Sequence, residues 1–286
     1  MTEELTVYDK ICRTRQNGRA TAADYMLSGA IFTDFCELHG DRCFGDDHAV
    51  IGGIALLHDL PVTVVGIEKG RDINERLYRN FGCVLPEGYR KALRLIREAE
   101  KFHRPVICFV DTQGANCGKG AEERGAGEAI AENLFELSDI RTPIITVMIG
   151  EGGSGGALAL AVADRVWMLR NAYYSVISPE SCASILFKDP HRAPEAAEHL
   201  RLTADDLLDM QIVEKVIEEP DDFRDSAACA NFMASLGDAL YAELRTLARR
   251  KPEKLVAERY EKYRKIGRYD SYGTRSGLWR WRLGGN

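Results

Sequence analysis

The chain has 286 residues, a formal net charge of −6 and 45% hydrophobic residues, a composition that can bury a substantial core and excludes disorder over most of its length. No apolar run reaches the ~18 residues that span a bilayer, and the first residues lack the pattern of a signal peptide, so we expect a cytoplasmic protein with no membrane contact. The eight cysteines form no C-x-x-C pair, which argues against zinc ribbons and disulfide frameworks.

Helical and strand patterns alternate along the first half of the chain. Apolar residues at helical spacing indicate amphipathic helices, and short apolar runs between turn residues indicate buried strands. In chain order the pattern predicts a helix over Ala20–His39, strands over Ala49–Leu57 and Val62–Ile67, a loop with a short helix over Glu68–Gly82, a helix from Pro86 to Phe102, a strand over Val106–Val110 and a helix over Ala121–Leu137.

The second half continues the alternation, which predicts an α/β core with helices covering the sheets. In order, we expect a strand over Pro143–Ile149, a helix over Ala157–Ala163, short strands over Val166–Leu169 and Tyr173–Ile177, helices from Ser178 and over Ala193–Leu208, a strand over Ile212–Ile217, and helices over Phe232–Ala248 and Leu255–Lys265.

The stretch Pro143–Ala163 combines an apolar strand, a glycine-rich junction and a helix. Glycines at such a junction allow positive φ and let a ligand approach the main chain. The first N–H groups of the helix have no internal partner, and the helix dipole favours negative charge there. The sequence therefore predicts a turn that binds a phosphate or stabilises an oxyanion. Its glycines are Gly150, Gly152, Gly153, Gly155 and Gly156.

Gly150–Gly155 also has the G-x-G-x-x-G spacing of a dinucleotide fingerprint. The acidic residue expected about 20 positions later is missing, and the motif lies in the middle of the chain. An NADP-type oxidoreductase remains an alternative that this motif and Arg170 suggest.

A second glycine turn, Gly114–Gly120, also comes after a buried strand, so we expect both turns at one cleft. Conventional catalytic side chains are scarce near them. Five of the six histidines lie in surface-like contexts, and His39 is a candidate cation at a helix end. The Asp111 carboxylate has a structural or a catalytic role. Cys117 is a candidate reactive thiol or a small packing residue. A site built from glycine amides favours chemistry whose main need is oxyanion stabilisation.

Three runs of residues resemble the α subunit of bacterial acetyl-CoA carboxylase carboxyltransferase. They are RNFGCVLPEGYRKALRL (79–95), IGEGGSGGALAL (149–160) and YSVISPESCASILFKD (174–189). The resemblance extends from about residue 20 to about residue 220. It implies a crotonase-like (ClpP/crotonase) ββα spiral with N- and C-terminal helical extensions. The implied parts are a helical segment 1–45, a carboxyltransferase domain 46–225, and C-terminal helices with a basic tail 226–286.

The resemblance further implies transfer of a carboxyl group from carboxybiotin to acetyl-CoA, giving malonyl-CoA for fatty acid synthesis. The family works as an α₂β₂ assembly with zinc on the β subunit, in an ATP-dependent complex with a biotin carboxyl carrier protein and a biotin carboxylase. No metal is expected in this chain, and the cofactor is its own base. The amides that match Gly155 and Gly156 form the oxyanion hole for biotin. Substrate and biotin contacts are expected at Gly152, Gly153, Ser154, Gly114, Ala115, Phe81 and Gly82.

Some positions depart from the family pattern. The family turn reads DTPGA followed by an aromatic and Pro, where this chain has Gln113 and then Asn116-Cys117; Met-Pro after Asn-Phe-Gly is replaced by Cys83-Val84. Two further alternatives therefore stay open, a paralogous subunit for another acyl-CoA and a non-catalytic interaction subunit.

The C-terminal region differs in charge from the rest. Arg245–Asn286 holds 13 Lys/Arg and 4 Asp/Glu, a balance of +9, which leaves −15 for the remainder. We expect its tail to dock on an acidic partner surface rather than on nucleic acid.

Overall fold

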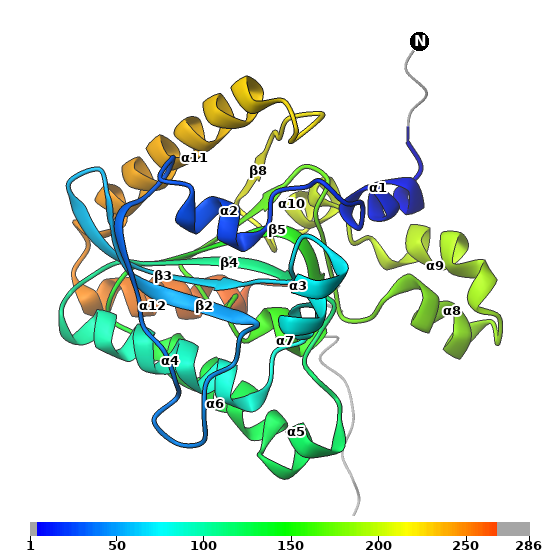
Figure 1. The fold of residues 1–286 in the computed structure, drawn as a ribbon, viewed down its shortest axis with the longest axis horizontal. Helices are drawn as coiled ribbons and strands as arrows, with labels where there is room; N and C mark the ends of the chain where they lie inside the picture. Colours follow the sequence, from blue (N-terminus) through cyan, green and yellow to red (C-terminus); the bar gives the residue numbers. More distant parts are fainter. Residues whose placement is uncertain (1–4, 268–286) are drawn as a thin grey trace, which may run out of the picture.

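The computed structural model describes residues 5–267, and the predicted basic tail at 268–286 lies outside them. An eight-stranded sheet runs through this part in the order β1-β2-β3-β4-β5-β6-β8, with β7 beside β5 (Figure 1). Its first three strands pair antiparallel, and the rest run parallel. The strands are β1 (Thr33–Glu37), β2 (Val50–Leu57), β3 (Leu60–Ile67), β4 (Val106–Thr112), β5 (Ile144–Gly153), β6 (Arg165–Leu169), β7 (Tyr173–Ser175) and β8 (Lys215–Ile217).

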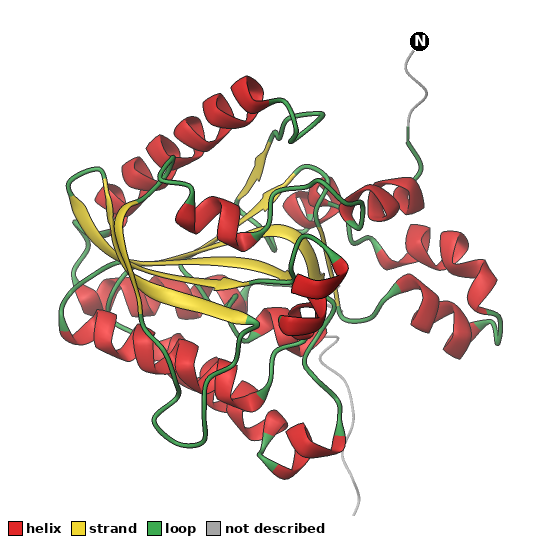
Figure 2. Cartoon of the chain, viewed as in Figure 1, coloured by secondary structure: helices red, strands yellow, loops and turns green. Residues whose placement is uncertain are grey.

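Helices cover both faces of the sheet (Figure 2). Figure 1 places α2 and α11 over one face and α4, α6 and α12 over the other. The helices are α1 (Val7–Thr14), α2 (Ala22–Leu27), α3 (Ile73–Tyr78), α4 (Pro86–Lys101), α5 (Lys119–Glu123), α6 (Ala126–Asp139), α7 (Ser154–Leu158), α8 (Pro179–Leu186), α9 (Ala193–Leu200), α10 (Ala204–Asp209), α11 (Ser226–Leu247) and α12 (Pro252–Arg264), with 3₁₀ turns η1 (Asn80–Gly82) and η2 (Pro190–Arg192).

The central strands are apolar because helices bury both of their faces. Every residue of β4 and β5 is buried. One hydrophobic core joins residues from all three predicted parts of the chain, such as Tyr25, Val64 and Leu240. Outside it, α8 and α9 project from the body beside α1 and share a small cluster of their own, Cys182, Ala183 and Ala196 (Figure 1). Within residues 5–267, no helix combines the length and apolar character needed to cross a membrane.

The predicted α/β core is confirmed, and the predicted strands are found with shifted ends. Three helix predictions merged separate elements. Ala20–His39 is α2 followed by strand β1, with Gly29 at φ 76° between them. Ala121–Leu137 is broken at Gly125 (φ 79°) into α5 and α6, and Ala193–Leu208 at Arg201 (φ 47°) into α9 and α10. A left-handed residue cannot continue a right-handed helix, so each break lies where one occurs.

In the glycine-rich stretch the strand ends later, and the helix begins earlier, than predicted. β5 does not end at Ile149 but continues to Gly153, because Glu151–Gly153 pair with β7. The helix predicted over Ala157–Ala163 overlaps the observed helix, α7 (Ser154–Leu158), only at Ala157 and Leu158. The glycines are therefore divided between a strand end and a short helix.

Candidate active site

The junction between β5 and α7 presents backbone amides at the edge of the sheet. Ser154 has φ 48°, so the chain turns sharply there before Gly155 and Gly156 enter the first turn of α7. In the described part of the chain, the amides of these two glycines find no backbone acceptor. Two free N–H groups at the start of a helix can hold one oxyanion.

The turn after β4 lies against this junction. A Cβ on Gly153 would lie 2.1 Å from the Gln113 carbonyl oxygen, and one on Gly156 would lie 2.5 Å from the Ala115 amide nitrogen. Gly114, at φ 141°, lies between these two contacts. The two glycine turns of the sequence thus pack directly on each other, and only glycine permits this approach.

The fingerprint glycines do not form a dinucleotide turn. Gly150 and Gly152 lie inside β5, and Gly152 pairs with Tyr174 of β7. A dinucleotide fingerprint needs its first glycines in the turn after the strand, where the pyrophosphate binds. The oxidoreductase alternative is therefore wrong for this site.

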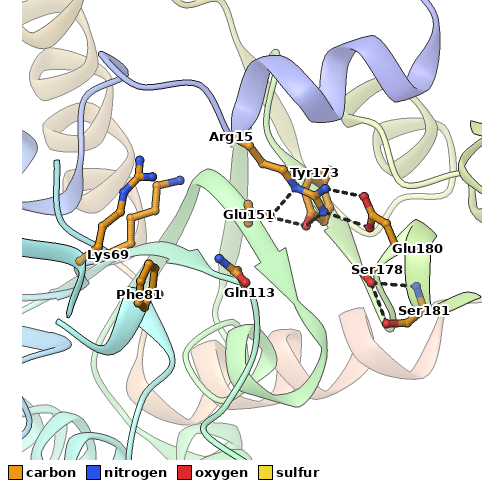
Figure 3. Close-up of a pocket in the computed structure, with 10 residues that line it drawn as sticks. Arg15, Lys69, Phe81, Gln113, Glu151, Tyr173, Ser178, Glu180 and Ser181 are labelled. Carbon is orange, nitrogen blue, oxygen red and sulfur yellow. Dashed lines mark hydrogen bonds and ion pairs between the residues drawn. The ribbon is translucent and has the colours of Figure 1, made fainter. Parts of the chain in front are cut away.

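The turn Asn80–Gly82 closes the site from a third direction. Asn80, Phe81 and Gly82 have φ values of 49°, 55° and 73°, three left-handed residues in succession. Thr112 Oγ1 donates to the Gly82 carbonyl at 2.6 Å and fixes this turn to the end of β4. Phe81 then lines the adjoining cavity (Figure 3).

A polar cavity of about 540 Å³ adjoins the β4 and β5 ends. Figure 3 shows Gln113 directed into it between Phe81 and Glu151. Its lining is charged and comes from segments far apart in the sequence: Arg15, Lys69, Arg76, Phe81, Gln113, Glu151, Tyr173, Ser178, Glu180 and Ser181.

Glu151 is the buried acid of this cavity. Its Oε2 accepts from Arg15 Nε at 3.0 Å and from the Tyr173 hydroxyl at 2.7 Å. Arg15 also pairs with Glu180 at 2.6 Å, which ties the chain after α1 to α8 (Figure 3). Burial, together with the Glu151 carboxylate, raises the pKa of Tyr173, so its hydroxyl stays protonated and remains a donor.

The predicted site residues fall into two groups. Phe81, Gly114, Ala115, Ser154 and Gly155 are half-buried, while Gly82, Gly152, Gly153 and Gly156 are buried. The five histidines predicted at the surface are exposed, and so is Cys117. His39 is exposed too, but it follows strand β1 and not the predicted helix. No group of three or more His, Cys, Asp or Glu within residues 5–267 is placed to hold a metal ion.

Sequence reasoning missed most of the cavity's charged side chains. Arg15 and Lys69 come from segments whose sequence is typical of exposed surface. Glu151 carried a usable signal, since a charged residue inside an apolar and glycine-rich run is buried only with a partner. Glu180 lies within the run 174–189. Its position in the first turn of a helix did not indicate an ion pair with Arg15.

Sequence comparison finds one family over nearly the whole described chain. A family model for acetyl co-enzyme A carboxylase carboxyltransferase-like proteins matches residues 1–267. The chain is 54% identical over 263 residues to the acetyl-coenzyme A carboxylase carboxyl transferase subunit alpha of Ruminiclostridium cellulolyticum, covering 92% of this chain and 98% of that protein. It is 53% identical over 268 residues to the subunits beta/alpha protein of Natranaerobius thermophilus, covering 93% of this chain but only 44% of that one.

Solved structures share the fold at low sequence identity. A Pseudomonas malonate decarboxylase hetero-tetramer matches with a TM-score of 0.64 and 16% identity, over 84% of this chain and 92% of that chain. The transcarboxylase 12S core matches with a TM-score of 0.61 and 21% identity, over 78% of this chain and 42% of that chain. These likenesses confirm the predicted crotonase-like fold.

Proposed function

The chain belongs to the acetyl-CoA carboxylase carboxyltransferase α-subunit family, and on that premise we propose that it forms half of a carboxyltransferase that makes malonyl-CoA from acetyl-CoA. The observation that carries the proposal is the pair of unpaired amides at Gly155 and Gly156, in a chain that is 54% identical to a carboxyl transferase α subunit. Enzymes of this kind act in fatty acid synthesis.

Carboxybiotin, carried on a partner protein, supplies the carboxyl group and the base when it is bound. The residues present fit such a group, because the two glycine amides lack backbone acceptors among the described residues and a polar cavity of about 540 Å³ lies at the same ends of β4 and β5, lined by Gln113 and Glu151. The amides of Gly155 and Gly156 donate to the ureido oxygen where negative charge develops. One such donor contributes about 10²–10³-fold to kcat in other enzymes. This accounts for a site without a catalytic histidine or cysteine.

The surrounding residues hold the amides and bind the substrates. Gly114 and Ala115 support the back of the junction, where a Cβ on Gly156 has no room. Phe81 and Gly82 form the facing wall, and Ser154 lies at the turn itself. Gly152 and Gly153, being buried, shape the strand end and act on the substrates through the backbone alone.

We also propose that the complementary half lies on a β subunit. The relative from Natranaerobius thermophilus, whose name joins beta and alpha subunits, supports this pairing. The β subunit would carry zinc and a second oxyanion hole in an α₂β₂ assembly, served by a biotin carboxyl carrier protein and a biotin carboxylase.

Reconstitution tests the function. The chain is mixed with a cognate β subunit and a carboxybiotinylated carrier, and acyl-CoA carboxylation is measured with acetyl-, propionyl- and butyryl-CoA. We expect malonyl-CoA as the main product. Preference for a longer acyl-CoA would identify a paralogous subunit. An assembled complex that is inactive with every acyl-CoA would refute the proposed enzymatic function.

A further inference from the structure

Asp111 ends β4 and is 2% exposed. The sequence left its role open between structure and catalysis. Its Oδ1 accepts from the Glu151 amide at 2.9 Å, and its carboxylate pairs with Lys69 Nζ at 2.8 Å. The side chain therefore joins the end of β3 to β5 through one buried ion pair and one backbone bond.

The backbone that Asp111 holds is the irregular part of β5. Val110 pairs with Met148, yet Thr112 pairs with Gly152, so β5 bulges over the intervening residues. A bulge bends its strand and re-aims the residues on its C-terminal side. Here those residues are Ser154 and the two amides of α7.

The carboxylate lies closely against this bulge. A Cβ on Gly150 would lie 2.4 Å from the Asp111 Cγ and Oδ1 atoms, so glycine is required there. One residue earlier, Arg19 donates to the Ile149 carbonyl at 3.0 Å and is itself held by Glu219 at 2.7 Å. Two ion pairs thus fix successive peptide groups of the bulge.

We propose that Asp111, paired with Lys69, is the positioning residue of the Gly155–Gly156 amides; this inference rests on the proposed function of those amides. A charge-assisted bond holds the Glu151 peptide more firmly than a neutral one. Donors to an oxyanion must be held within about 0.5 Å of their productive geometry. Lys69 also cancels the negative charge of Asp111, which would otherwise repel an oxyanion nearby.

The other end of β5 supplies a matched control. Asp164 is 4% exposed, pairs with Arg259 at 2.8 Å, and accepts from the Ile144 amide at 2.8 Å. It therefore makes the same two contacts as Asp111, but at the start of the strand, away from α7. A purely structural role predicts the same consequences for Asp111→Asn and Asp164→Asn.

The experiment compares these two variants in the assembled complex with a β subunit. We expect both to lower Tm, and only Asp111→Asn to lower kcat for carboxyl transfer, by about 100-fold, the effect of misplacing a reacting group by about 1 Å. KM for the acyl-CoA should stay unchanged. Lys69→Gln leaves Asp111 without its positive partner and should also lower kcat. Lys69→Arg keeps the positive charge and should retain most of the wild-type kcat.

Amide hydrogen exchange over residues 148–158 gives a second readout that needs no activity. Exchange should be faster in Asp111→Asn than in Asp164→Asn. Equal exchange, or equal kcat in the two variants, would overturn the positioning role. A wild-type complex that transfers no carboxyl group would refute the proposed function instead, and the exchange rates would still decide whether Asp111 positions the turn.

Discussion

Gly155 and Gly156 are neighbours with opposite steric surroundings. A Cβ on Gly155 meets nothing nearer than Ile130 Cγ2 at 3.8 Å, an ordinary contact. A Cβ on Gly156 would lie 2.5 Å from the Ala115 amide nitrogen and 2.9 Å from the Tyr89 hydroxyl. Glycine at position 156 is thus required by packing, whereas at position 155 only its amide is needed.

This contrast predicts different stabilities for two alanine variants. Gly156→Ala should lower the free energy of unfolding by about 1–3 kcal/mol, the usual cost of overpacking a closed site. Gly155→Ala should leave it unchanged. Urea unfolding of the isolated chain measures both values. A Gly156→Ala variant as stable as the wild type would show that the turn after β4 moves to accommodate the added methyl group.

The sequence located the amide pair but not the side chains around it. Glycines between an apolar run and a helix can be recognised from the sequence alone, because glycine allows backbone conformations that other residues rarely adopt. The pairing of Arg15 with Glu151 joins segments 136 residues apart, and a single sequence contains no signal for such a distance. Only the burial of Glu151 within an apolar run hinted that a cation lies near.

Helix α8 illustrates which elements a sequence predicts well. α8 begins at Pro179 after the capping residue Ser178, as predicted, because both residues mark a helix start. Breaks at glycine or at a left-handed arginine were missed, since helical periodicity continues across them. Ser154 was hardest, because a left-handed conformation in a serine is set by tertiary packing.

The ion pair between Arg15, at the end of α1, and Glu180 of α8 predicts a pH effect. Although burial opposes it, the hydrogen bond from Arg15 lowers the pKa of Glu180 below its ordinary value of 4.5. The contact therefore stabilises the fold fully above pH 4.5 and less as the pH falls through the lower folded-state pKa. Glu180→Gln should cost about 0.2–1 kcal/mol at pH 7, because the pair is partly exposed.

Thermal unfolding of wild type and Glu180→Gln across pH 3–7 measures this effect. The two Tm values should differ at pH 7 and converge at the acidic end. A difference that stays constant down to pH 3 would mean that Glu180 acts through packing and not through its charge.

In the molecule as a whole, strand β5 ends directly before one pair of amides, those of Gly155 and Gly156 in α7. The cavity at the β4 and β5 ends is polar, and the β5–α7 junction presents one pair of adjacent amides without a backbone acceptor in residues 5–267. Transfer between two substrates develops charge on two oxygens, so a second pair of donors is required. Under the proposed function, the β subunit would supply these donors.

The isolated chain should therefore be inactive. Malonyl-CoA formation should appear only when a β subunit is added, together with a rise in native mass that indicates a hetero-oligomer. Turnover by the chain alone, at a mass of one or two copies, would show that it holds both oxyanion sites.

The most direct measurement compares Gly155→Pro with Gly155→Ala in the assembled complex. A Cβ at this position meets only an ordinary contact, and proline is tolerated in a first helical turn, but only proline removes the amide hydrogen. We predict that Gly155→Pro lowers kcat for malonyl-CoA formation by about 10²–10³-fold, with assembly unchanged, while Gly155→Ala stays near the wild type. Equal rates for the two variants would contradict the oxyanion role of this amide.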